Sequence, residues 1–164
     1  MGTDSVSGIS KYEYALGTEP GNVDIINWQD TNVVNSALIS GLSLWDANKY
    51  YVSIKATDKA GNVSAVKTGD GITIDLSPPI IGTVNDGIED DIVTTEFTTT
   101  LSANWTGFSD ATSGIASYEY AIGTTSGGTD TKNWTINGLD STVTATGLTL
   151  AYTNTYFISI RATD

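Results

Sequence analysis

The chain has 164 residues, and its 19 acidic side chains outnumber the 7 basic ones, which gives a net charge of −12. This charge argues against nucleic acid as a partner, because proteins that bind it cluster Lys and Arg to displace counterions, and against an anionic membrane surface. The sequence has no cysteine and no histidine, which excludes disulfides and argues against zinc sites and Ser-His or Cys-His nucleophiles. No apolar run approaches the roughly 18 residues of a membrane span, so membrane insertion is not expected.

The first half of the chain predicts short β-strands separated by turns. Alternating apolar and polar side chains predict a strand over Ile9–Thr18, and the clearest strand covers Tyr50–Asp58. Two shorter strands are expected between them, and a final strand, with an irregularity near two glycines, follows a hairpin turn. These three are Ile25–Trp28, Val33–Ile39 and Val63–Asp75.

The second half begins with a linker, Leu76–Pro79, whose two prolines stiffen the backbone and forbid a helix. Ile80–Val84 opens the second unit, and an acidic loop, Asn85–Asp91, follows it. A strand is predicted over Thr98–Trp105. No window of useful length has helical periodicity, so the chain is predicted to be all-β.

One stretch occurs twice at an offset of 106 residues. Residues 4–58 align with residues 110–164 without a gap, and 24 of the 55 aligned pairs are identical. A repeat this regular indicates two copies of one architectural unit.

Several motifs within this repeat and between its two copies resemble a known family. They are the strand with Trp105, the Tyr-x-Tyr-x-Leu strand, the pattern Tyr-x-Val-x-Ile-x-Ala from Tyr50, and the phrases ATDKAGNVS and DLSPPIIGTVNDG. Together they resemble the tandem fibronectin type III-like (Ig-like) domains of bacterial secreted and surface proteins. The resemblance covers nearly the whole chain. It implies tandem β-sandwiches and an extracellular or cell-surface location.

Mapped onto that family, the chain holds two incomplete domains. Residues 1–75 would be a partial repeat with strands C to G, residues 76–79 a linker, and residues 80–164 a repeat with strands A to F. The first repeat lacks strands A and B, and the second lacks strand G. We therefore expect either that neighbouring repeats of a longer polypeptide supply the missing strands, or that identical chains self-associate through the open half.

Several repeated side chains have a structural and a functional interpretation. The tyrosine stripe of each repeat is either a binding surface or, as alternation favours, part of the core. The resemblance implies that Tyr50 and Tyr156 form tyrosine corners, in which the hydroxyl bonds nearby backbone. Glu13 with Lys55, and Glu119 with Arg161, are predicted to be cross-strand ion pairs. The tyrosines of the stripe are Tyr12, Tyr14, Tyr118 and Tyr120.

The tryptophans are the candidate ligand contacts. Trp28 and Trp134 are either platforms on which sugar rings stack or apolar lids over the edge of a sheet, and the lid is favoured. Trp45 is replaced by Ala151 in the second copy and lies in a polar loop, so it is the better candidate for contact with a ligand.

Acidic turns invite a calcium interpretation. The resemblance places the turn of Asp110 and the end of the strand at Asp164 beside the arriving linker, so Asp75, Asp110 and Asp164 are the candidate Ca²⁺ ligands, at the inter-domain junction. The alternative, which we favour for Asp4, Asp58 and their counterparts, is an aspartate that bonds the backbone of its own turn. The acidic loop Asn85–Asp91 lacks calcium-loop spacing and is predicted to be a solvated turn.

The leading functional hypothesis is a non-enzymatic spacer or adhesion module from a tandem-repeat bacterial extracellular protein. Its partners would be neighbouring repeats of the same or an identical chain. The alternative is a glycan-binding accessory module of a secreted polysaccharide-active enzyme, with Trp45, Trp28 or Trp134 as the contacts. The sequence shows no catalytic carboxylate pair, phosphate loop or nucleophile elbow, so no enzymatic activity is expected.

Overall fold

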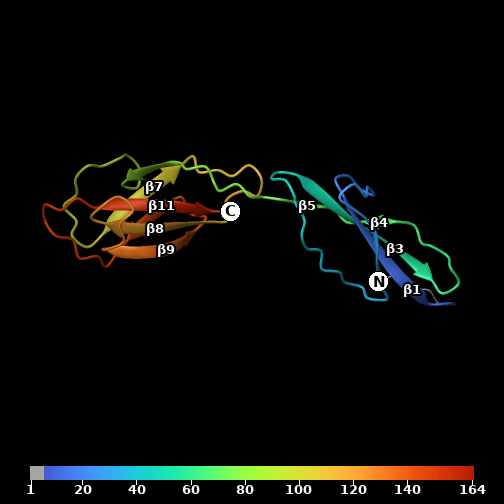
Figure 1. The fold of residues 1–164 in the computed structure, drawn as a ribbon. Helices are drawn as coiled ribbons and strands as arrows, with labels where there is room; N and C mark the ends of the chain where they lie inside the picture. Colours follow the sequence, from blue (N-terminus) through green and yellow to red (C-terminus); the bar gives the residue numbers. More distant parts are fainter. Residues whose placement is uncertain (1–5) are drawn as a thin grey trace. The chain divides into compact units, whose positions relative to one another are not determined.

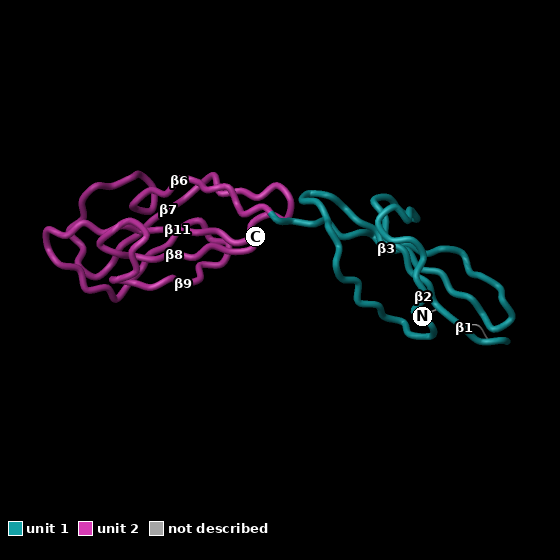
Figure 2. Tube along the Cα trace, in the orientation of Figure 1, with its two compact units in different colours: residues 1–76 teal, residues 77–164 magenta. Residues whose placement is uncertain are grey.

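The computed structural model describes residues 6–164, and all the regular elements in that part of the chain are β-strands (Figure 1). This confirms the all-β prediction. The chain divides into two compact units, Met1–Leu76 and Ser77–Asp164, and the boundary falls within the proline-containing segment Leu76–Pro79 (Figure 2). The described residues include no helix of the length and apolarity needed to cross a membrane.

The first unit is built on one antiparallel sheet with the order β2-β1-β3-β4, and β5 also pairs with β3. Apolar and polar residues alternate along β1 and β3, which suits strands whose two faces meet different environments. The strands are β1 (Ile9–Gly17), β2 (Ile26–Asn32), β3 (Lys49–Asp58), β4 (Lys67–Thr68) and β5 (Ile72–Thr73).

The second unit contains two antiparallel sheets of three strands each, in the orders β10-β7-β6 and β11-β8-β9. Residues of both sheets share one buried cluster, which is the arrangement expected of a β-sandwich. The strands are β6 (Thr83–Asp86), β7 (Leu101–Thr106), β8 (Ser117–Gly123), β9 (Lys132–Gly138), β10 (Thr142–Ala145) and β11 (Phe157–Thr163).

The core of the second unit contains Tyr120, a member of the tyrosine stripe that alternation assigned to the core. Tyr120 and Ile158 are buried together with Leu148, and Tyr156 and Ile160 pack against them. Ala103 and Ala145 contribute the small residues of the opposite sheet. Trp105 of β7 is 2% exposed and meets Tyr118 edge to face, with ring centroids 5.5 Å apart. Alternating large and small side chains therefore fill the space between the sheets.

The two copies of the repeated segment adopt the same strand register. Glu13 lies opposite Lys55 in the β1–β3 pair, and Glu119 lies opposite Arg161 in the β8–β11 pair. The register shifts of β1 against β2, next to Tyr12 and Tyr14, recur at the equivalent tyrosines of β8 against β9. The sequence repeat is thus also a repeat of sheet geometry.

The predicted strand over Val33–Ile39 is wrong. In the structure β2 ends at Asn32, and residues 33–48 form no strand. The equivalent segment of the second copy, Thr142–Ala145, is a strand because it pairs with β7. The first unit has no strand equivalent to β7 among its described residues, so the backbone groups of its segment have no ladder to join.

The predicted final strand over Val63–Asp75 is shorter than expected and interrupted. Only β4 and β5 are regular, with an isolated bridge at Val63. The break between them contains Gly69 and Gly71, and Gly71 has a φ of 87°. This positive φ accounts for the irregularity that the sequence predicted there.

Candidate functional site

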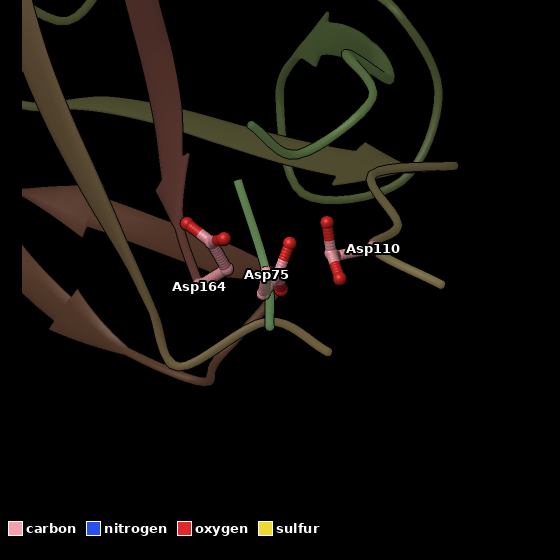
Figure 3. A group of neighbouring side chains, drawn as sticks. All are labelled: Asp75, Asp110 and Asp164. Carbon is pink, nitrogen blue, oxygen red and sulfur yellow. The ribbon is translucent and has the colours of Figure 1, made fainter. Parts of the chain in front are cut away.

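Three aspartates offer the one group of possible metal ligands found among residues 6–164. One carboxylate oxygen from each of Asp75, Asp110 and Asp164 lies within 4.8 Å of the others (Figure 3). Asp75 follows β5, Asp110 lies in the turn between β7 and β8, and Asp164 directly follows β11. Asp75 and Asp110 are half-buried and Asp164 is exposed.

Asp110 also organises its own turn. Its Oδ1 accepts backbone N–H groups from Ser113 and Thr112, both at 2.8 Å, and from Gly114 at 3.3 Å. These bonds, the one from Ser113 first, hold the pKa of the Asp110 carboxyl below its ordinary value. The turn role predicted as the alternative is therefore present, and it keeps this carboxylate ionised at neutral pH.

The chemistry of this group suits a hard divalent cation. Three carboxylates offer only oxygen donors, which Ca²⁺ prefers, and carbonyl oxygens or water would complete its six to eight ligands. In the first copy, Asp58, the counterpart of Asp164, instead accepts two bonds of 2.8 Å from the backbone and side chain of Asn62. Asp4, the counterpart of Asp110, lies outside the described residues. Calcium binding stays a prediction.

The acidic loop after β6 is tied down by an asparagine that the sequence did not single out. Asn104 of β7 donates its side-chain N–H groups to the carbonyl oxygens of Gly87 and Glu89, at 3.1 and 3.0 Å. The backbone N–H of Asp86 donates to Asp91 at 3.0 Å. Burial, and then the charge of Asp91, raise the pKa of Asp86. These contacts give the loop a structural role.

Two of the three candidate tryptophans are covered by a cation. The Nζ atom of Lys55 lies 4.3 Å from the ring centre of Trp28. The guanidinium carbon of Arg161 lies 4.3 Å from the ring centre of Trp134. A cation in this position occupies a face of the indole on which a sugar ring would stack.

The same cations complete the predicted ion pairs. Lys55 lies 3.8 Å from Glu13, and Arg161 lies 2.8 Å from Glu119. Each copy therefore carries the same row of carboxylate, cation and indole on one face of its sheet. The contacts within that row favour the structural interpretation of Trp28 and Trp134.

Trp45 is the most exposed tryptophan, with 73% of its surface accessible. Its backbone N–H donates to the hydroxyl of Tyr50 at 3.0 Å, and Ala151 donates to the hydroxyl of Tyr156 at 2.9 Å. These two bonds confirm the prediction that both tyrosine hydroxyls bond nearby backbone. They also anchor the loop that presents the Trp45 indole to solvent.

A small hollow in the second unit was not predicted from the sequence. It has a volume of about 110 Å³ and is lined by Phe97, Tyr152 and Tyr156 among others. This is well below the roughly 300 Å³ at which small-molecule pockets begin. Phe97 and Tyr152 lie in irregular segments, which is why strand periodicity did not find them.

Comparison with models of protein families and with curated proteins gives no match for this chain. The functional assignment therefore rests on the repeat and on the contacts of its residues.

Proposed function

We propose that the chain is a non-enzymatic structural module, built of fibronectin type III-like sandwiches, from a tandem-repeat protein of the bacterial cell surface or exterior. The observation that carries this proposal is the use of the repeated polar and aromatic side chains. In both copies these side chains contact other parts of the same sheet or its turns. Examples are the tyrosine hydroxyls and the rows of carboxylate, cation and indole.

A third repeated contact supports the same proposal. Asp24 accepts bonds from the backbone and hydroxyl of Thr18, at 3.1 and 2.8 Å. Asp130 accepts the same two bonds from Thr124, both at 2.9 Å. A carboxylate committed to a turn in this way is less suited to acid–base work at a substrate.

The proposal also includes an assignment of the strands to positions in the fibronectin type III-like domain. In the fibronectin type III-like scheme, β6, β7 and β10 would be strands A, B and E, and β8, β9 and β11 would be strands C, C′ and F. The segment of β4 and β5 would be strand G of the first domain. The prolines at positions 78 and 79 fix φ and lack N–H groups, so they would restrict bending between successive domains.

The proposal is tested by exposing the intact chain to a panel of polysaccharides and measuring both retention and hydrolysis. A structural module should show neither saturable binding nor turnover. Saturable binding that is lost on Trp45→Ala, and kept in the matched variant Val93→Ala, would replace the spacer with the alternative. Val93 is a suitable control because it is 94% exposed and aliphatic.

That alternative is a glycan-binding accessory module of a secreted polysaccharide-active enzyme. The exposed indole of Trp45 favours it, because exposed aromatic rings stack on sugars and, within residues 6–164, no Lys or Arg side chain lies over this ring. The alternative predicts quenching or a blue shift of tryptophan fluorescence on titration with the bound polysaccharide, and no such change in Trp45→Ala.

A further inference from the structure

The two copies of the repeat have nearly the same side chains on one face of the sheet, but this face is buried to different extents in the two units. In the second unit, the face of β8 and β11 lies beneath the sheet formed by β6, β7 and β10. Tyr120 is 7% exposed there, Ile158 is 9% exposed, and Ile160 packs against the same cluster.

In the first unit, the equivalent face of β1 and β3 is covered only in part, since Leu16 is 5% exposed but its neighbours on the face are more accessible. Tyr14 and Val52, the counterparts of Tyr120 and Ile158, are only half-buried. Ile54, the counterpart of Ile160, is 47% exposed. Tyr14, Val52 and Ile54 are called the acceptor face below.

Within residues 6–164, the neighbouring segment of the first unit also has no partner strand. Residues 36–39 form no strand, although the equivalent residues 142–145 form β10. In the second unit β10 pairs with β7, from Thr142 opposite Asn104 to Ala145 opposite Leu101. Residues 36–39 are called the acceptor edge below.

We propose that the acceptor face and acceptor edge bind a pair of antiparallel β-strands of the kind that β6 and β7 form in the second unit. The β7-like strand would pair with the acceptor edge. Its inward side chains would lie on the acceptor face as Ala103 lies on the core of the second unit. The first unit would then have a binding surface in addition to its structural role, and its partner would be a pair of strands with apolar inward side chains.

The second copy of the repeat indicates which kind of strand fits the acceptor face. Tyr14 and Ile54 are identical to their counterparts in the second unit, and Val52 differs from Ile158 by one methylene group. Tyr12 is likewise identical to Tyr118, whose ring lies in a T-shaped contact with that of Trp105. A strand with the inward pattern of β7 would therefore meet the same shapes in the first unit as it meets in the second.

A partner strand cannot pair with the outer edge of β3. β4 and β5 already pair with β3, placing Lys67 opposite Ile54 and Ile72 opposite Tyr50. A partner strand therefore adds over the face and along the acceptor edge. Backbone hydrogen bonds there would supply affinity, and alternate side chains on the face would supply specificity.

The test is a fusion in which residues 77–109 replace residues 1–3 of the intact chain. Asp110 corresponds to Asp4 in the repeat, so this join reproduces the natural spacing between β7 and β8 in front of β1. Hydrogen exchange measured by mass spectrometry then reports on residues 36–39, β1 and β3. We expect exchange at these positions to slow by at least about tenfold relative to the unfused chain.

Two variants of the fusion test the contacts. Aspartate at the donor positions equivalent to Ala103 and Trp105 should abolish the protection, because each charge would be buried against apolar side chains. Ile54→Asp on the acceptor face should do the same. The matched control is Ile136→Asp, since Ile136 is 74% exposed on β9 and the first copy carries an aspartate, Asp30, at that position. This control should keep the protection.

Three results would overturn the proposal. One is equal exchange in the fused and unfused chains while β8 and β11 stay protected. Another is protection that persists in the fusion with aspartate at the positions equivalent to Ala103 and Trp105. The third is sedimentation of the unfused chain as a dimer that Ile54→Asp dissolves and the fusion leaves intact, because the occupant would then be the same face of a second copy. If the fusion gives no protection and the chain binds no glycan, the strand-binding proposal fails and the proposed structural module still holds. The two proposals can therefore be tested separately.

Discussion

Lys55 and Arg161 occupy the same place in the two copies and make the same pair of contacts, with a glutamate on the next strand and an indole beside it. Cross-strand pairs of this kind contribute about 0.2–1 kcal/mol, and a cation over an exposed ring about 0.5–1 kcal/mol. Neither term alone holds the fold together. Their recurrence shows that an exchange of Lys for Arg preserves the geometry of the row.

Larger energies belong to single core residues, of which Trp105 is the clearest. Trp105→Ala removes a side chain that is 2% exposed and its edge contact with Tyr118, so the second unit should lose about 3–5 kcal/mol of unfolding free energy. Trp105→Phe keeps an aromatic ring and should cost less. Urea denaturation followed by far-UV circular dichroism measures both. A Trp105→Ala chain with an unchanged midpoint would contradict the core assignment.

Acid sensitivity should be traceable to individual turn aspartates, for example Asp130. The backbone N–H and then the hydroxyl of Thr124 lower the pKa of this carboxyl from its ordinary value of 3.8. A depressed folded-state pKa contributes stability above the unfolded-state pKa, and that stability is lost as pH falls through the folded-state value.

The variant Asp130→Asn cannot titrate and should melt below the parent chain at neutral pH. The gap between the two melting temperatures should close as the pH is lowered below 3.8. Thermal scans from about pH 7 to about pH 2 measure the gap. A gap of constant size would show that the carboxylate charge contributes nothing to this turn.

At the scale of elements, a strand pattern in the sequence predicts a strand only where a partner exists. Ile9–Gly17 and Lys49–Asp58 were predicted to within one residue because they pair with each other. Val33–Ile39 has comparable β-propensity but no partner in the described residues, and it stays irregular. Strand propensity is largely a statement about neighbours, and a single segment carries no information about them.

The candidate site and the acidic loop likewise depend on contacts between elements. Asp75, Asp110 and Asp164 were proposed as a group from the positions of loops in a resembling fold, and their oxygens lie within 4.8 Å of one another. Asn104, which fastens the acidic loop, was missed because its side chain acts on residues about 15 positions away in the sequence. Local spacing predicts turns well, whereas contacts between elements need the fold.

The turn after β1 depends on a glycine for space, not for φ. A Cβ on Gly17 would lie 2.5 Å from the carbonyl oxygen of Asn22. Gly17→Ala should therefore destabilise the first unit by about 1–3 kcal/mol, as overpacking does. The matched variant Gly69→Ala places its Cβ 3.8 Å from the Val52 carbonyl oxygen, an ordinary contact, and should stay within about 0.5 kcal/mol. Chemical denaturation compares them, and equal effects would contradict this account of the turn.

At the scale of the whole molecule, the chain has 19 acidic and only 7 basic groups, and this negative charge favours cation binding. Millimolar Ca²⁺ should raise the melting temperature, and EDTA should reverse the rise. At a hundredfold excess over the dissociation constant the added stability is about 2.7 kcal/mol.

The decisive variant for calcium is Asp110→Asn, which keeps an oxygen for the turn N–H groups but removes the charge. It should lose most of the calcium response. Asp91→Asn in the other acidic loop should keep it. A melting temperature that ignores calcium in the parent chain would leave the turn role as the whole function of Asp110.

The last prediction concerns the unequal cover of the two units. Tyr14 and Tyr120 sit between the same neighbours, Glu and Ala, so their backbone amides have nearly the same intrinsic exchange chemistry. Only Tyr120 is buried, beneath the β6-β7-β10 sheet. Because local opening tracks buried apolar contacts, the Tyr14 amide should exchange at least about tenfold faster in the intact chain. Amide exchange resolved by NMR measures both in one sample. Equal rates would mean that the β1–β3 sheet is stable without cover, and the strand-accepting role inferred for it would then lose its physical basis.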